Sequence, residues 1–128
     1  FHPEVEENPI EILKLIKKEN VEAGIALHPK INILEYEELF TLVDQIIVMT
    51  VIPGFGGQKF IESQVKKIED LYNLRKIKNY KFKISADGGI NDISGKKCIK
   101  SGVDILAVGS FLLSKPETEF DKIINSFK

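Results

Sequence analysis

Apolar residues recur along the chain with two spacings, and these alternate from one segment to the next. Short runs rich in β-branched residues, or alternating with polar ones, predict four strands, at Val21–Leu27, Ile46–Val51, Lys81–Ala86 and Val103–Val108. Apolar residues three or four positions apart predict helices around these runs. The expected helices cover Asn8–Asn20, Ile33–Val43, about Ile61–Lys76, Asn91–Ser101 and the segment from Pro116 onward.

The order of these elements is one helix followed by four strand–helix units. Repeated units of this kind form a parallel α/β sheet with right-handed crossovers. Two closures fit the order, an open doubly wound sheet and part of an eight-stranded barrel. A complete barrel needs about 250 residues. The chain has 128 residues, so it could supply roughly half of a barrel.

The stretch Ile46–Phe60 organises the rest of the chain. It runs from a buried strand into Pro53-Gly54-Phe55-Gly56-Gly57 and then into a helical pattern. Loops at the carboxyl ends of parallel strands are where ligands bind. Three glycines in four positions let backbone N–H groups approach an anion, because no Cβ blocks the way. A loop with ordinary turn chemistry fits the same residues.

Two further glycine-bearing turns follow the next two strands, Asp87-Gly88-Gly89 and Gly109-Ser110. In a parallel sheet the carboxyl ends of the strands point the same way, so all three loops lie at the same end of the sheet. In barrels, the loops after the last two strands and a short helix, here Ser110–Leu113, form a phosphate cradle. The residues therefore predict a phosphorylated small-molecule ligand.

Asp87 is the one acidic residue at the mouth of a strand with two glycines beside it. A carboxylate there could bind a metal or move a proton. The alternative is that Asp87 caps the next helix or turn.

Asp104 lies at the other end of its strand. In a barrel, residues at that end contribute to stability rather than to catalysis. His2 and His28 also follow strands but fit loop roles better. Met49 fits the core, or the wall of a pocket beside the glycine-rich loop.

Composition narrows the classes of protein and partner. With 43% hydrophobic residues and a net charge of −1, the chain has the composition of one globular domain and no basic excess for nucleic acid. No apolar run reaches the length of a membrane span. The single cysteine, Cys98, excludes an intrachain disulfide and argues against a zinc ribbon, so we expect a reducing, cytoplasmic location.

The chain begins at Phe1 without a methionine, and Phe1-His2-Pro3-Glu4 has the pattern of a strand end. We expect a fragment, a processed chain or a partial record.

Taken together, these residues resemble the ribulose-phosphate 3-epimerase family. The match runs through Val48–Val51, the very specific Pro53–Phe60 (PGFGGQKF), Asp87–Ile90 and Val108–Ser110, with Phe1, His2, Glu4 and Ala26–Pro29 in support. It covers essentially the whole chain. The resemblance implies a (β/α)8 TIM barrel, of which residues 1–128 are the C-terminal part of a single domain, from the end of strand four through strands five to eight.

The resemblance also implies the chemistry. Members interconvert D-ribulose 5-phosphate and D-xylulose 5-phosphate, a step of the pentose phosphate pathway, by proton transfer through an enediolate. They use one divalent metal, zinc first, with iron, manganese or cobalt as substitutes. Asp87 would be a catalytic acid/base and a metal ligand, Met49 would wall the pocket, and the protein would be a homo-oligomer. The substrate would lie against Gly54, Phe55, Gly56, Gly57, Asp87, Gly88, Gly89, Gly109 and Ser110.

Departures from the family pattern keep alternatives open. Ile52 stands where the family has Asn or Glu, and His28-Pro29-Lys30 replaces Lys-Pro-Gly. The family's two metal-binding histidines and second aspartate have no match, so this chain should be inactive by itself. The alternatives are another phosphosugar epimerase or isomerase of the same barrel type, and an inactive phosphate-binding half-barrel.

Overall fold

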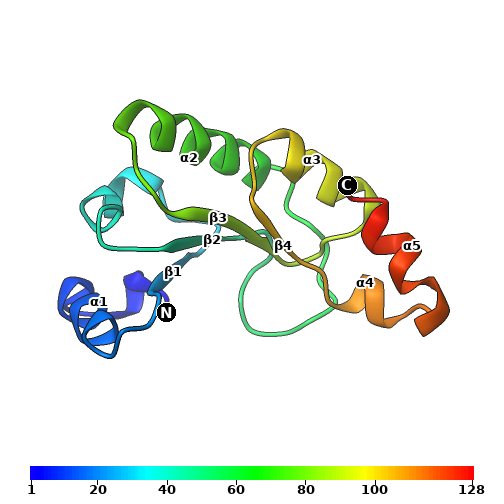
Figure 1. Cartoon of the computed structure of the whole chain (residues 1–128), viewed down its shortest axis with the longest axis horizontal. Coiled ribbons are helices and arrows are strands. Elements are labelled where there is room, and N and C mark those ends of the chain that lie inside the picture. The colour runs from blue at the N-terminus through cyan, green and yellow to red at the C-terminus, as the bar shows by residue number, and fades with distance from the viewer.

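A computed structural model describes residues 1–128, and its centre is a parallel sheet with strands in the order β1-β2-β3-β4 (Figure 1). The strands are β1 (Gly24–Leu27), β2 (Gln45–Met49), β3 (Lys83–Asp87) and β4 (Ile105–Ala107). Each neighbour in the sheet is also the neighbour in sequence, as a βα barrel requires. The predicted alternation of strands and helices is therefore confirmed.

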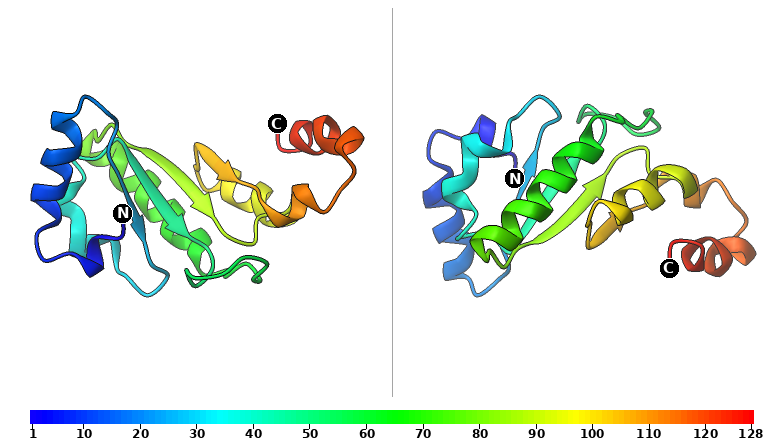
Figure 2. Two further views of the ribbon diagram at one scale, coloured as in Figure 1. Left: turned by 90° about the horizontal axis from the view of Figure 1, so that it is seen from below. Right: turned by 90° about the horizontal axis from the view of Figure 1, so that it is seen from above.

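Five α-helices and three 3₁₀ helices connect and follow the strands. They are α1 (Pro9–Lys18), α2 (Gln64–Lys78), α3 (Asp92–Lys100), α4 (Ser110–Leu113), α5 (Phe120–Asn125), η1 (Pro3–Val5), η2 (Ile33–Leu39) and η3 (Glu117–Glu119). Helices α2 and α3 lie side by side on one face of the sheet, while α1 and α5 lie at opposite ends of the molecule (Figures 1 and 2). None of the helices is both long and apolar enough to cross a lipid bilayer.

Burial alternates along β2, and in β3 the three central residues are buried while the residues at both ends are exposed. Ile46, Val48 and Ile84 are fully buried, whereas Lys83 and Asp87 are exposed. Since successive side chains of a strand point to opposite faces, one face of the sheet packs under the helices and the other remains open. A cluster of 16 buried residues fills the covered side, including an aromatic group in which the Phe40 and Phe82 ring centroids lie 5.3 Å apart.

The residues that follow α5 pack against α3 through an aromatic ring. A Cβ added to Gly95 of α3 would lie 2.5 Å from Cε1 of Phe127. The bare backbone of Gly95 is therefore what lets Phe127 dock onto α3.

Phe1 lies beside β1 on its free edge. Its amino group donates to the carbonyl of Gly24 (3.2 Å), and its carbonyl accepts from the N–H of Ala26 (2.8 Å). These two bonds have the pattern of a parallel ladder, so the prediction that the chain opens on a strand end is confirmed for Phe1.

One predicted helix is wrong in type. Residues 33–43 form the 3₁₀ helix η2 over Ile33–Leu39, with a kink at Tyr36 (φ −124°, ψ 18°). Residues three apart lie above one another in a 3₁₀ helix, and Ile33, Tyr36 and Leu39 accordingly face inward. Leu34, which a 3.6-residue period places on the inner stripe, is 61% exposed.

The other differences are shifts of element ends. The first strand begins at Gly24 rather than Val21, and the last α-helix begins at Phe120, after η3, rather than at Pro116. Helix α2 begins at Gln64 and ends at Lys78, and the left-handed backbone of Asn79 (φ 57°) terminates it.

Candidate functional site

A hollow of about 580 Å³ opens at the carboxyl ends of β2, β3 and β4. Three glycine-rich segments surround it, one after each of these strands. All ten residues that the sequence singled out for the site line it: Met49, Gly54, Phe55, Gly56, Gly57, Asp87, Gly88, Gly89, Gly109 and Ser110. The fold thus brings together residues up to 61 positions apart (Met49 to Ser110) in one place.

Asp87 lies at the centre of this rim. It is the last residue of β3, and its register partners are Met49 on one side and Ala107 on the other. The carboxylate is exposed and makes no hydrogen bond or ion pair within the chain, which leaves it available to a ligand. The alternative that Asp87 caps the next helix is wrong, because the Asn91 side chain caps α3 by accepting from the N–H groups of Ile93 and Ser94.

The two glycines after Asp87 are required by their surroundings. Both have positive φ, +119° at Gly88 and +61° at Gly89. A Cβ on Gly88 would overlap the side chain of Val51, and one on Gly89 would lie 2.6 Å from the backbone nitrogen of Phe60. The turn therefore packs directly against the loop that follows β2.

The side chain of Gln58 stabilises the loop after β2 through hydrogen bonds to its backbone. Nε2 of Gln58 donates to the carbonyls of Ile52 (2.6 Å) and Phe55 (2.9 Å). Ile52, which departs from the family pattern, contributes its carbonyl here while its side chain is exposed. Phe55 is 73% exposed at the tip of the loop.

Thr50 joins the loop to the turn after β3. Its hydroxyl donates to the carbonyl of Gly88 (2.6 Å), and its backbone N–H donates to the carbonyl of Asp87 (2.8 Å). Neither Thr50 nor Gln58 was among the residues predicted for the site. Gln58 lies within the specific PGFGGQKF run, whereas Thr50 matches its β-branched neighbours and offers no signal of its own.

Comparison with known proteins identifies the family. Residues 1–113 match the Ribulose-phosphate 3 epimerase family. The chain belongs to this family. It is 41% identical over 95 residues to Ribulose-5-phosphate-3-epimerase, chloroplastic, of Arabidopsis thaliana, covering 74% of the chain and 34% of that protein.

Bacterial relatives match at similar levels. Ribulose-phosphate 3-epimerase of Bacillus subtilis is 38% identical over 99 residues, 77% of the chain and 46% of that protein. The protein of the same name from Buchnera aphidicola is 34% identical over 128 residues, all of the chain and 55% of that protein. The chain therefore spans about half the length of the curated relatives it matches, or less.

The epimerase family has the TIM-barrel fold, and the four consecutive parallel strands of this chain correspond to half of that barrel. The hollow lies at the carboxyl ends of the strands, where barrel enzymes place their active sites.

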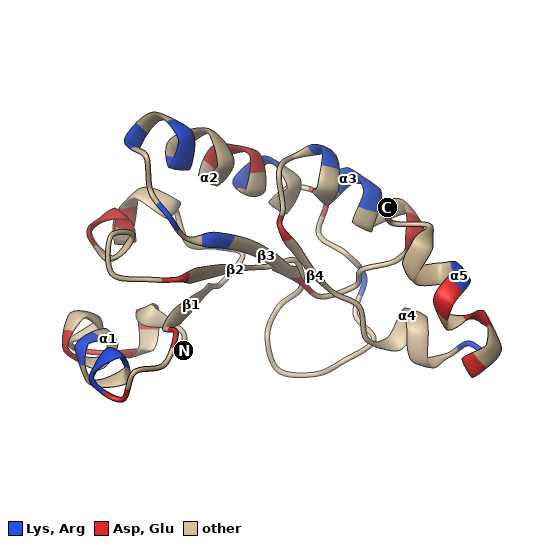
Figure 3. Ribbon diagram, viewed as in Figure 1, with Lys and Arg blue, Asp and Glu red and all other residues tan.

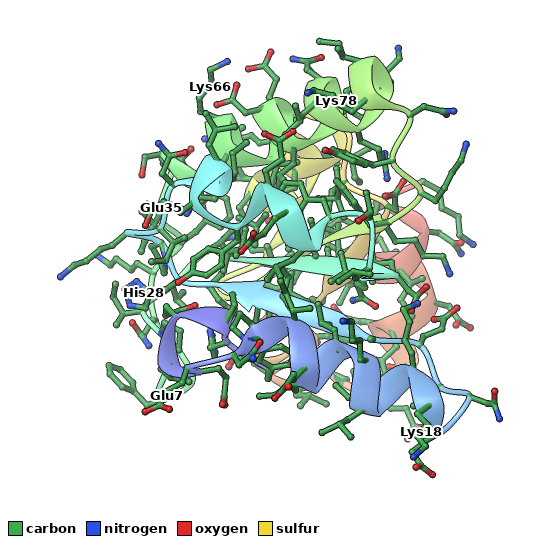
Figure 4. All side chains as sticks on the ribbon, turned by 90° about the vertical axis from the view of Figure 1, so that its left-hand side faces the viewer. Glu7, Lys18, His28, Glu35, Lys66 and Lys78 are labelled. Carbon is green, nitrogen blue, oxygen red and sulfur yellow. The ribbon has the colours of Figure 1, made fainter.

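The two histidines of this epimerase-family chain lie outside the hollow. Nδ1 of His28 accepts from the N–H of Lys30 (3.2 Å), and Figure 4 shows His28 at the periphery of the molecule. Nδ1 of His2 lies 3.4 Å from Oε1 of Glu4. Nζ of Lys67 donates to the carbonyl of His28 (3.0 Å), and burial lowers the pKa of this lysine. These contacts give the histidines loop roles.

Asp104 lies at the amino end of β4, away from the hollow, as predicted. Its Oδ2 accepts from the N–H of Ile84 (2.7 Å), and its carboxylate pairs with Arg75 of α2. Both contacts are structural.

The chain does not contain a complete set of metal ligands. It contains no group of three or more His, Cys, Asp or Glu side chains placed to hold a metal ion. Asp87 is the only one of these residue types that lines the hollow. A carboxylate oxygen suits zinc and harder divalent cations alike, so Asp87 has the donor chemistry of a single metal ligand.

Proposed function

We propose that the complete protein carrying this chain is a ribulose-phosphate 3-epimerase that interconverts D-ribulose 5-phosphate and D-xylulose 5-phosphate. One observation carries the proposal beyond family membership. An exposed carboxylate, Asp87, stands without a partner among three glycine-rich turns at the carboxyl end of a parallel sheet. This arrangement offers a group for proton transfer beside a surface suited to a phosphate.

Backbone N–H groups supply that surface. Within the chain, none of the N–H groups of Gly54, Gly56, Gly57, Gly88, Gly89 and Gly109 donates a backbone hydrogen bond. Free N–H groups that converge on one space form anion sites. We assign the substrate phosphate to these turns, with Ser110 and Phe55 beside it and Met49 as the apolar wall next to the sugar.

Asp87 would transfer the proton. Its carboxylate would accept the proton from the carbon next to the ketone on one face of the substrate, leaving an enediolate. Return of a proton to the opposite face, from a second acid outside this chain, would complete the inversion. A divalent metal, zinc first and iron, manganese or cobalt otherwise, would neutralise the charge that develops on the substrate oxygens. Asp87 would be one of its ligands.

The test is the Asp87→Asn variant of the complete protein, assayed with D-ribulose 5-phosphate. The amide cannot accept the proton, and it binds a metal more weakly than a carboxylate does. Turnover should therefore fall by at least about a hundredfold. Asp121→Asn, an exposed aspartate on α5, is the matched control and should keep full turnover. Unchanged circular dichroism would show that the fold is intact, and turnover retained by Asp87→Asn would refute the role.

In this proposal the glycine-rich turns hold the phosphate and contribute little to recognition of the sugar. A panel of phosphorylated ketoses would therefore separate this substrate from those of related barrel epimerases. We further propose a homo-oligomeric, cytoplasmic enzyme. Lys and Arg residues are spread over α1, α2 and α3, interspersed with Asp and Glu (Figure 3), which supports a small-molecule partner rather than nucleic acid.

A further inference from the structure

Thr50 is a buried polar residue directly below the proposed phosphate site. It is 0% exposed, and it makes three hydrogen bonds. Besides its bonds to Asp87 and Gly88, its carbonyl accepts from the N–H of Ile61 (2.8 Å). A buried hydroxyl costs free energy unless it is hydrogen-bonded. Valine would fill the same volume without that cost, so the bond to Gly88 is what sets threonine apart at this position.

The bond to Gly88 fixes the direction of the next amide. The carbonyl of one residue and the N–H of the following residue point in opposite directions across a trans peptide, and the chain has no cis peptide bonds. Because the Gly88 carbonyl points to Thr50, the N–H of Gly89 points away from it. This N–H has no acceptor in the chain, and Gly89 lines the hollow.

The second carbonyl of the turn also has a hydroxyl beside it. Oγ of the buried Ser94 lies 3.1 Å from the carbonyl oxygen of Gly89. Carbonyl oxygens repel a phosphate and N–H groups attract it. Holding the carbonyl oxygens of Gly88 and Gly89 at hydroxyl groups therefore leaves the N–H groups as the free polar groups of the turn.

We propose that Thr50 is a positioning residue whose hydroxyl holds the Gly88–Gly89 peptide with its N–H directed at the bound phosphate. This rests on the proposed function for the identity of the ligand, but it concerns phosphate binding and can be measured without turnover. Thr50 is not a catalytic residue, since it reaches the ligand only through the Gly88–Gly89 peptide.

The experiment compares Thr50→Val and Thr50→Ser in the complete protein, with inorganic phosphate as the probe and calorimetry as the readout. Loss of the hydroxyl in Thr50→Val should weaken phosphate binding about tenfold, which corresponds to roughly one hydrogen bond. Thr50→Ser keeps the hydroxyl and should bind within about twofold of wild type. Thr41→Val, the same change at an exposed position, is the matched control and should bind as wild type.

A second readout reports the amide itself. In a phosphate titration followed by 1H–15N NMR, the Gly89 resonance should shift in wild type and in Thr50→Ser, and it should shift much less in Thr50→Val. In the epimerase assay, Thr50→Val should raise KM more than it lowers kcat. Thermal midpoints identify variants that have lost the fold.

Three results would overturn the inference: unchanged phosphate affinity in a folded Thr50→Val, a Thr50→Ser variant as weak as Thr50→Val, or a Gly89 amide that does not respond to phosphate in wild type. The last needs no variant, so the test stands even if Thr50→Val fails to fold. Phosphate binding that depends on Thr50 in a protein without epimerase turnover would refute the proposed function and leave the inference intact.

Discussion

At the scale of the residue, the glycines around the hollow differ in what a side chain would meet. Gly89 combines a left-handed φ of +61° with a Cβ position 2.6 Å from the Phe60 backbone nitrogen. Gly56 has no such φ and nothing within 4 Å of a Cβ. The first glycine is required by the fold of the chain itself, whereas the second is free to serve a ligand.

Gly89→Ala should therefore destabilise the complete protein by about 3 kcal/mol, because both the backbone angle and the clash with Phe60 oppose it. Gly56→Ala should change the free energy of unfolding by less than about 0.5 kcal/mol. Urea unfolding followed by circular dichroism measures both. Equal losses in the two variants would show that the packing of the turn against Phe60 does not matter.

Cys98 should be chemically inert in the folded chain. It is fully buried, and burial raises the pKa of its thiol to about 11. The thiolate is the reactive form, so alkylation by iodoacetamide at pH 8 should be at least about a hundredfold slower than in the urea-unfolded protein. Mass spectrometry of timed samples measures both rates, and comparable rates would contradict the burial.

Asp87 and the glycines beside it could be predicted as site residues because their types are unusual at strand ends. Thr50 could not. In sequence it is one more β-branched residue of a strand, and its function depends on the Gly88 carbonyl, 38 residues away. Roles that arise from a contact between two loops appear only once the fold has brought the loops together.

At the scale of the element, an aspartate precedes each of two strands and makes the same kinds of contact. Asp44 and Asp104 directly precede β2 and β4. Asp44 accepts from the N–H of Ala23, just before β1, and Asp104 accepts from the N–H of Ile84 in β3 (2.7 Å each). Each also pairs with a basic residue of a preceding helix, Lys17 of α1 and Arg75 of α2. Each aspartate thus links its own strand to a neighbouring segment and to a helix, at the end of the sheet opposite the hollow.

This contact predicts a pH dependence of stability. The hydrogen bond from Lys17, and then that from Ala23, lower the pKa of Asp44 below its ordinary value of 3.8. A carboxyl with a lowered pKa stabilises the fold above its unfolded pKa, and this contribution is lost as the pH falls through the folded pKa. Asp44→Asn should cost about 1 kcal/mol at pH 6, a small value because the pair is partly exposed. The difference from wild type should shrink below pH 4.

Chemical unfolding of wild type and Asp44→Asn between pH 2.5 and 7 tests this. Glu38→Gln, an exposed glutamate of η2 without an ion pair, is the control. A constant gap across the range would mean that the charge of Asp44 contributes nothing.

The order of the elements could be predicted because hydrophobic runs and helical spacing report burial directly. The type of η2 could not. Residues 33–43 contain enough apolar residues for either helix, and it is packing against the core that involves Ile33, Tyr36 and Leu39 at a three-residue period. The local spacing of apolar residues does not record these core contacts.

At the scale of the molecule, the sheet is half covered. Helices protect one face, while Lys83, Asp87 and Ile105 on the other face are exposed. The chain corresponds to half of the family's barrel, and Asp87 is the single acid that lines its hollow. Binding and catalysis should therefore depend on the rest of the barrel.

The isolated 128-residue polypeptide should consequently show no epimerase turnover and retain no stoichiometric zinc, because one carboxylate is too few ligands for tight binding. Elemental analysis after dialysis against a weak chelator measures the metal. The complete protein, treated in the same way, is the control and should lose turnover only when a strong chelator removes its metal. One zinc ion per isolated chain would contradict this.

The contact between Gly95 and Phe127 has a practical consequence for handling the protein. A side chain at position 95 would displace the Phe127 ring, because a Cβ there has no room beside it. Substitutions of Gly95 should therefore loosen the packing of Phe127 and Ile124 beside Leu106, which exposes apolar surface and favours aggregation. Engineered variants of the protein should keep glycine at this position.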